Sequence, residues 1–155
     1  MSQPISNQES RPIRLKNQLC FPLYACSRKI TSLYTPLLKP FGLSYTQYIC
    51  LMTLWEEDGQ KVGSIAQKLL LDTGTLTPML KTMEKEGLIR RTRDPEDERS
   101  VLVNLTDAGK EMESRLADIP LCVGSCVMES LSPEEAATMY RLLYKIIDKP
   151  CKESR

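Results

Sequence analysis

Residues 71–81 read LDTGTLTPMLK. Asp72 is suited to cap a helix over Thr73–Glu86, because its side-chain oxygen can accept a hydrogen bond from a first-turn N–H. Gly87 is suited to end that helix. Pro78 conflicts with the helical pattern, since proline has no backbone N–H to donate.

The pattern of apolar residues changes directly after this helix. Residues 88–93 and 100–105 alternate as strands do, around a charged turn that reads DPEDER at residues 94–99. The two segments therefore predict a β-hairpin that follows the helix.

Two shorter helices are expected upstream. Ser44 and Gln47 have the spacing of a capping box, and the helix that they begin is expected to end near Gly59. Val62–Leu69 predicts the next helix. Two helices, a longer helix and a hairpin in this order predict a helix-turn-helix with a β wing.

Further helices flank this unit. Apolar residues recur every three or four positions from Leu15 to Leu37, with Pro22 marking a kink or a late helix start. Thr106 is expected to cap a long helix that reaches about Glu129. Ser132 begins a capping box for a last helix. Pro150 is expected to end it.

These elements predict a mainly α fold with a small β wing, a winged helix-turn-helix. The flanking helices carry more apolar surface than a monomer of this size needs, so we expect a homodimer. We expect a flexible arm at 1–14 and one domain at 15–149. Within it, 44–106 would bind DNA, and 15–43 with 107–149 would form the dimer.

Composition excludes several functions. The 155 residues are 41% hydrophobic and 26% charged, with a net charge of +1, which neither favours nor excludes nucleic acid. No apolar run approaches the ~20 residues that span a bilayer, so we expect a cytoplasmic protein without membrane contact. The sequence has no histidine, the usual general base and metal ligand, and no Cys-x-x-Cys. We expect no metal, no cofactor and no enzymatic activity.

Local charge is more informative than net charge. Residues 73–93 hold five basic and two acidic side chains, a local charge of +3, and phosphates attract such a surface. The hydroxyl-rich start of the helix at residue 73 can enter a major groove. Arg99 at the wing tip can read the minor groove, pair with Asp97 or Asp94, or do both. The expected DNA contacts are Asp72, Thr73, Thr75, Thr77, Lys81, Arg90, Arg91, Arg93, Asp97 and Arg99.

The helix and wing resemble a known family. Residues 71–81, the EGL of 86–88 and the DER of 97–99 are similar to the recognition helix and wing of the MarR family of transcriptional regulators. In that family proline at the position of Pro78 is part of the motif. The resemblance covers Leu15 to Met112 and implies a dimeric repressor of double-stranded operator DNA.

Other segments resemble one branch of that family, the OhrR group of organic-hydroperoxide sensors. They read NQLCF at 17–21, LSYTQY at 43–48 and LWEE at 54–57. The resemblance implies that an organic hydroperoxide is the inducer. A regulator released by a small aromatic ligand, with the cysteine incidental, is the alternative. A thiol peroxidase is disfavoured because nothing predicts a parallel sheet.

The resemblance assigns roles to one cysteine and three tyrosines. From its residue type alone, Cys20 is better explained as a small buried apolar residue than as a reactive thiol. Tyr34 and Tyr45 can likewise be core aromatics with satisfied hydroxyls. By the resemblance, Cys20 reacts with the peroxide. Tyr34 and Tyr45 reach its thiolate across the dimer, and Tyr24 lies nearby.

The remaining cysteines differ in what is expected of them. Some members of the group carry a resolving cysteine after the wing, and Cys122 is our candidate, with Cys126 one turn later as a backup. Both could instead be packing residues, because sequence alone does not give a disulfide partner. Cys26 and Cys50 lie in apolar patterns and are expected in the core. Cys151 has no assigned role.

Overall fold

A computed structural model describes residues 14–149 of the chain. The helices are α1 (Cys20–Leu38), α2 (Tyr45–Glu56), α3 (Val62–Leu69), α4 (Thr73–Lys85), α5 (Asp107–Leu116), α6 (Ile119–Met128) and α7 (Pro133–Ile147). The strands are β1 (Gln60–Lys61), β2 (Ile89–Arg93) and β3 (Val101–Leu105). Short 3-10 helices at Leu15–Asn17 and Lys39–Phe41 flank α1. The mainly α fold with a small β wing is confirmed.

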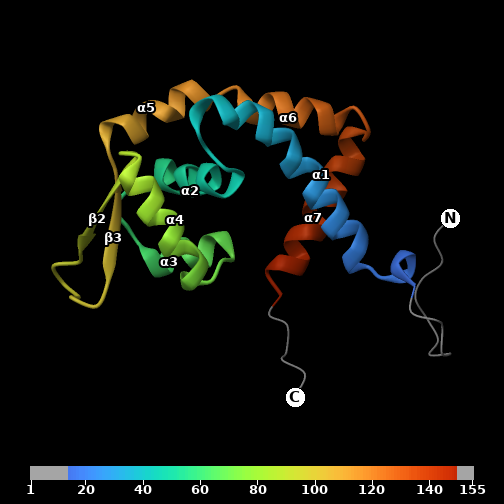
Figure 1. The fold of residues 1–155 in the computed structure, drawn as a ribbon. Coiled ribbons are helices and arrows are strands. Elements are labelled where there is room, and N and C mark those ends of the chain that lie inside the picture. The colour runs from blue at the N-terminus through green and yellow to red at the C-terminus, as the bar shows by residue number, and fades with distance from the viewer. Residues whose placement is uncertain (1–13, 150–155) are drawn as a thin grey trace, which may run out of the picture.

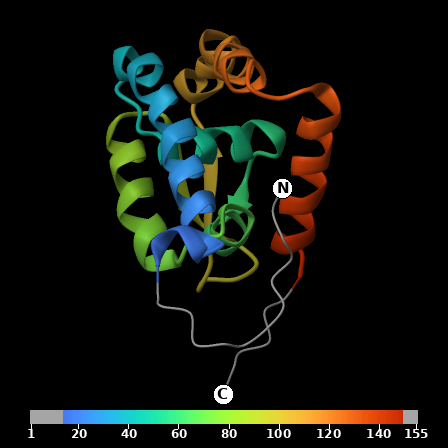
Figure 2. The same cartoon turned by 90° about the vertical axis from the view of Figure 1, so that its right-hand side faces the viewer.

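The structure divides into two parts that α5 and α6 connect (Figure 1). On one side, α2, α3 and α4 pack beside the hairpin of β2 and β3, and we call residues 44–106 the winged part. On the other side lie α1 and α7, which Figure 2 shows standing apart from each other. The sheet is antiparallel in the order β1-β3-β2, with Val103 opposite both Gln60 and Arg91.

The core of the winged part is closed. Side chains with no exposed surface come from α2, α3, α4 and β3: Cys50, Leu51, Leu54, Ile65, Leu76, Leu80, Met83 and Val103. Removal of this apolar surface from water stabilises the winged part, and it fixes which face of α4 remains outside.

Local sequence signals set the helix boundaries. The Ser44 side chain accepts from Gln47 N, and Gln47 Oε1 accepts from Ser44 N at 2.8 Å, so the predicted capping box is confirmed. The capping box at Ser132 is also confirmed. Gly87 follows α4 with a φ of +76°, a conformation that favours glycine. Pro22 lies in the first turn of α1, where a backbone N–H is not needed, so the predicted late start is confirmed.

One predicted element is wrong. The long helix from Thr106 to about Glu129 is two helices, because α5 ends at Leu116 and α6 begins at Ile119. Pro120 explains the break, since a proline within a continuous helix removes an N–H donor and clashes with the carbonyl four residues earlier, here that of Leu116.

The expected arm at 1–14 lies almost entirely outside the described residues, as do Pro150 and Cys151. Among residues 14–149, no helix is long and apolar enough to cross a membrane.

Candidate nucleic-acid interface and redox site

The N-cap residue Asp72 stabilises the first turn of α4. Asp72 Oδ1 accepts from Thr75 N at 2.7 Å, and the Thr75 hydroxyl donates to Asp72 Oδ2 at 2.6 Å. The hydrogen bonds from Thr75 hold the pKa of Asp72 below its usual value. The Thr77 hydroxyl donates to Thr73 O at 2.7 Å. Asp72, Thr73 and Thr75 thus form an ordered, exposed helix start, with Thr77 half-buried beside them.

The exposed face of α4 lies opposite its buried residues. Leu76, Leu80 and Met83 point into the core, and the side chains left outside include Thr73, Thr75, Pro78, Lys81 and Lys85. The helix continues through Pro78, which is itself exposed. The predicted groove-reading face is therefore available on the surface.

Arg91 was expected from the sequence to contact DNA, but in the structure its side chain is bonded to Glu84. Its guanidinium donates two hydrogen bonds to Glu84 Oε2, at 2.8 and 2.9 Å, and its backbone N–H donates to Glu84 Oε1. These contacts tie β2 to α4 and hold the pKa of Glu84 below its usual value. Arg91 is thereby an ion-pair partner within the fold, which reduces its availability to a phosphate.

The two faces of the hairpin separate the basic residues that the sequence grouped together. Arg91 and Arg99 line one cleft of about 280 Å³ with Thr73 and Thr77 of α4. Arg90 lines a different hollow on the opposite face of the strands, with Asn104. Alternation along a strand causes this separation. Arg99 therefore lies beside the start of α4, and Arg90 does not.

The wing turn is organised by two aspartates. Asp97 accepts from Arg99 N at 3.1 Å and from the Ser100 hydroxyl at 2.6 Å, so it shapes the backbone at Arg99. The Asp94 carboxylate, 6% exposed, pairs with Lys61 Nζ at 2.8 Å. Among the described residues, no ion pair joins Arg99 to Asp97 or Asp94, so the expected Arg99 salt bridge is not formed.

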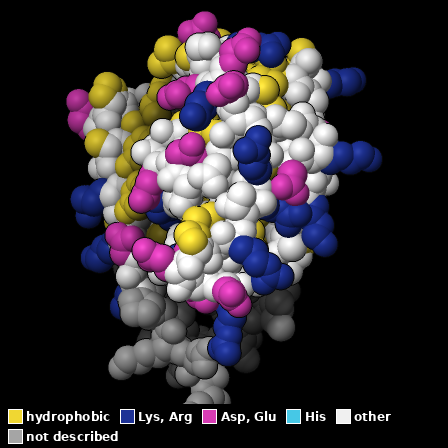
Figure 3. Space-filling view, turned by 90° about the vertical axis from the view of Figure 1, so that its left-hand side faces the viewer, with side chains coloured by type: hydrophobic (Ala, Val, Ile, Leu, Met, Phe, Trp, Pro, Cys, Tyr) yellow, Lys and Arg dark blue, Asp and Glu magenta, His cyan; other side chains and the backbone are white. Residues whose placement is uncertain are grey.

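Charge on the winged part is mixed rather than uniformly basic. Figure 3 shows Lys and Arg side chains interspersed with Asp and Glu over the face that carries the hairpin. Arg93 is also engaged, since its guanidinium donates to Glu98 O at 2.8 Å. The cations on this face therefore lie among acidic side chains and do not form a broad positive field.

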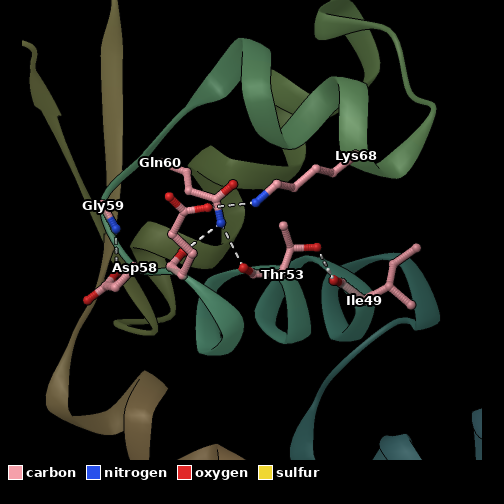
Figure 4. Close-up of polar contacts among 7 residues, drawn as sticks. Ile49, Thr53, Asp58, Gly59, Gln60 and Lys68 are labelled. Atoms are coloured by element: carbon pink, nitrogen blue, oxygen red, sulfur yellow. Dashed lines mark hydrogen bonds and ion pairs between the residues drawn. The ribbon is translucent and has the colours of Figure 1, made fainter.

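A buried glutamine joins α2 to the strand that precedes α3 (Figure 4). Gln60 Nε2 donates to Thr53 O at 2.7 Å and to Glu57 O at 2.6 Å. Glu57 in turn pairs with Lys68 of α3 at 2.8 Å. These contacts satisfy carbonyls at the end of α2 and hold β1 and α3 against it.

Cys20 is the first residue of α1 and is exposed. The partial positive charge of a helix N-terminus lies at this position, which favours an anion. Tyr24 follows one turn later with its side chain 59% exposed, and the Arg28 guanidinium lies 5.8 Å from the centre of its ring. The predicted proximity of Cys20 and Tyr24 on one helix face fits this spacing.

Tyr34 lies towards the other end of α1, beside Tyr45 at the start of α2. Their ring centres are 5.0 Å apart, but fourteen residues of helix, about 21 Å, separate Tyr34 from Cys20. Burial raises the pKa of both phenols, so both remain hydrogen-bond donors at neutral pH. Within one chain, the Cys20 thiol is therefore far from both tyrosines.

The other cysteines divide by burial. Cys50 is fully buried in α2, which confirms the expectation, and burial raises its pKa to about 12. Cys26 is exposed on α1, so its expected place in the core is wrong: its position on the helix faces away from the packed side. Cys122 and Cys126 are exposed on α6, one turn apart.

Apolar surface remains open around the start of α1. Leu19 and Leu23 face Met139, Leu142 and Ile146 of α7 across a groove of about 560 Å³. Eleven large hydrophobic side chains are exposed in the described residues, and nine of them belong to the first 24 residues or follow Gly124: Leu15, Leu19, Leu23, Tyr24, Tyr140, Leu142, Tyr144, Ile146 and Ile147. Exposed apolar surface of this kind marks an interaction site.

Comparison with known proteins agrees with this architecture. Residues 43–101 match the MarR family model. The organic hydroperoxide resistance transcriptional regulator of Bacillus subtilis is 43% identical over 136 residues, which cover 88% of this chain and 91% of the relative. The chain belongs to the MarR family.

A second relative, AbfR, has been solved in several states. AbfR bound to DNA, in reduced and in overoxidized form, is 37% identical with a TM-score of 0.71, over 86% of this chain and 91–93% of AbfR. The disulfide form of AbfR is 38% identical with a TM-score of 0.57, over 86% of this chain and 92% of AbfR. This MarR-family chain therefore has a fold closer to that of the DNA-bound states.

Several positioning contacts were missed from the sequence. Glu84 with Arg91 and Lys61 with Asp94 join different elements, and no periodic pattern relates such positions. The strand β1 was missed because two residues are too few for an alternation. Only Arg99 was considered from the sequence as a partner for Asp94, and the structure pairs Asp94 with Lys61 instead.

Proposed function

We propose that this MarR-family regulator is a homodimeric repressor that leaves its operator when an organic hydroperoxide oxidises Cys20. The placement of Cys20 carries the proposal. The thiol is exposed at a helix start, next to uncovered apolar surface, and about 21 Å of helix separates it from the tyrosines that would hydrogen-bond it.

A second copy of the chain completes this site. Residues 15–43 and 107–149 would form the dimer, which covers the exposed apolar side chains of α1 and α7. In that assembly Tyr34 and Tyr45 of one subunit reach Cys20 of the other. Two relatives support this proposal. The B. subtilis relative is an organic hydroperoxide resistance regulator. AbfR has been solved reduced on DNA and in a disulfide form.

The winged part, residues 44–106, would bind double-stranded operator DNA. The start of α4 would enter the major groove, with Thr73 and Thr75 exposed and Thr77 half-buried beside them. Lys81 would meet a phosphate, and Arg99 would enter the minor groove beside it. Two such units in a dimer would read half-sites one helical turn apart.

The sensing reaction would need only the Cys20 thiolate and the peroxide, without a cofactor. The Cys20 thiolate attacks one peroxide oxygen, the O–O bond breaks, and the departing alkoxide takes a proton to become an alcohol. Cys20 is thereby oxidised to a sulfenic acid, and the peroxide is reduced. Tyr34 and Tyr45 hydroxyls would donate hydrogen bonds to the thiolate before attack.

A second thiol would then convert the sulfenic acid to a disulfide and release water. Cys122 is our candidate, with Cys126 as the backup, and both are exposed on α6. The first turn of α1 lies at the end of that helix away from α6 (Figures 1 and 2), so the partner thiol would come from the other subunit. Because AbfR has been solved on DNA when overoxidized, we assign release to the disulfide rather than to oxidation alone.

The test compares Cys20→Ser with Cys26→Ser, a matched exposed cysteine on the same helix. Both variants should bind operator when reduced, because serine is nearly isosteric. One equivalent of cumene hydroperoxide should release wild type and Cys26→Ser, measured by fluorescence anisotropy of labelled operator, and should leave Cys20→Ser bound.

Non-reducing mass analysis of the same samples identifies the resolving thiol. Wild type should form a covalent dimer that Cys122→Ser does not form. Loss of the cross-link in Cys126→Ser instead would move that role by one helical turn. Hydroperoxide-induced release of Cys20→Ser would refute the sensor and favour a regulator released by a bound aromatic ligand.

A further inference from the structure

The tyrosine pair continues as a chain of aromatic contacts into the winged part. Tyr34 lies 5.8 Å from Tyr48 and Tyr48 lies 6.2 Å from Trp55, measured between ring centres. Tyr48, Trp55 and Tyr45 all belong to α2. Aromatic pairs at these separations attract each other and pack in a defined geometry. Displacement of Tyr34 or Tyr45 therefore acts directly on α2.

Among the described residues, the Trp55 side chain makes one hydrogen bond, and it is with α5. Its indole Nε1 donates to Gly109 O at 2.9 Å. Gly109 lies tightly against the segment between α4 and β2: a Cβ at this position would lie 2.1 Å from Leu88 O. Only glycine permits that approach.

The same turn of α5 is bonded to the segment that connects α4 to β2. Thr106 N donates to Leu88 O at 3.1 Å, and the Thr106 hydroxyl donates to Gly87 O at 2.6 Å. The position of the first turn of α5 thus sets the position of the junction between recognition helix and wing.

Space beside the indole allows it to move. A cavity of about 300 Å³ is lined by Tyr48, Met52 and Trp55 of α2 and by Leu116 and Pro120 near the break between α5 and α6. A ring that loses its packing against Tyr48 can swing into this space and release Gly109 O.

We propose that Trp55 is a positioning residue that connects the Tyr34–Tyr45 pair to the α4–β2 junction through its hydrogen bond to Gly109. This inference rests on the proposed function, since it assigns the route by which oxidation at Cys20 reaches the DNA-binding surface. The Tyr34 and Tyr45 rings move when the thiol leaves them for the disulfide, and Trp55 transmits that movement to α5.

Trp55→Phe tests the route because phenylalanine retains the ring and loses the N–H. The measured quantity is the ratio of operator affinities before and after oxidation by cumene hydroperoxide, at fixed salt. We expect this ratio to fall by about two- to tenfold, the effect of one hydrogen bond, with an unchanged rate and yield of Cys20 oxidation. Met52→Leu, which lines the same cavity, is the matched control and should keep the wild-type ratio.

A second readout uses Trp55 itself, the single tryptophan of the sequence. Oxidation of wild type and of Met52→Leu should shift the indole emission, and hydroperoxide treatment of Cys20→Ser should not. An affinity ratio in Trp55→Phe equal to that of wild type overturns the inference while the sensor stands. Unchanged emission on oxidation overturns it as well. Wild type that stays on DNA after complete oxidation overturns the proposed function and the inference together.

Discussion

The winged part and the flanking helices differ in how complete they are within one chain. In the winged part, α2, α3, α4 and β3 contribute side chains with no exposed surface, and ion pairs fix α4 to β2 and β1 to the wing. In the flanking helices, α1 buries only Leu38 and α7 only Ala136, and large apolar residues face outward. The winged part thus buries a closed set of apolar side chains within one chain, whereas α1 and α7 leave most of theirs exposed or half-buried.

This difference explains why a redox signal belongs at the helical end. An interface between subunits can have two packed arrangements, and a covalent link can select one of them. A closed core of the kind in the winged part resists such change. The sensor would therefore act where packing depends on a partner, and the winged part would move as a unit.

The largest effect should come from the packed core. Leu80→Ala removes a fully buried side chain of α4 and should lower the free energy of unfolding by about 2–5 kcal/mol. Denaturant unfolding measures it, and the loss should be present at every protein concentration.

Leu142→Ala should behave differently, because Leu142 is 46% exposed on α7. Its main effect should be a weaker dimer in sedimentation, with a midpoint of unfolding that falls as the protein is diluted. Leu70→Ala, at an exposed leucine of the winged part, is the control and should leave the dimer intact. A dimer unaffected by Leu142→Ala would place the interface elsewhere.

An intermediate effect should come from the wing. Arg99 lines a cleft with the start of α4, and Arg90 points to the other face of the sheet. Arg99→Ala should weaken operator binding by about 1–3 kcal/mol, as loss of a groove contact does. Arg90→Ala removes the same charge and should cost less. Equal losses measured by anisotropy would mean that long-range charge, not placement, determines binding.

Sequence reasoning worked where a signal was local. Ser44 and Ser132 begin helices because a hydroxyl and a carboxylate or amide three residues later satisfy first-turn N–H groups. It failed at the α5–α6 break. Apolar residues keep their helical spacing across Pro120, so the spacing did not reveal that Pro120 lacks a backbone N–H and ends the helix. It also failed at Cys26, because an apolar pattern does not say which side of α1 the rest of the chain covers.

The candidate sites show the same limit. The residues expected at the thiol and at the DNA surface came from the resemblance and from local chemistry, and their roles remain predictions. Contacts such as Trp55 with Gly109 join positions 54 residues apart, and only the fold brings them together. The sequence could therefore indicate which side chains carry the chemistry but not which ones orient them.

The smallest effect concerns acid titration at the base of the wing. The hydrogen bond from Lys61 holds the pKa of the buried Asp94 below its usual value. A folded-state pKa below the unfolded value, about 3.9 for aspartate, stabilises the fold above that pH, and the contribution is lost as the pH falls through the folded-state pKa. Lys61→Met removes the cation, so NMR should find that the Asp94 carboxyl titrates at higher pH. Lys68→Met, which breaks the exposed pair with Glu57 instead, should leave Asp94 unchanged. An Asp94 pKa that is the same in Lys61→Met and in wild type would assign its depression to the backbone N–H of Glu96, which donates to Asp94 Oδ1 at 2.9 Å, and would remove Lys61 as the anchor of the wing.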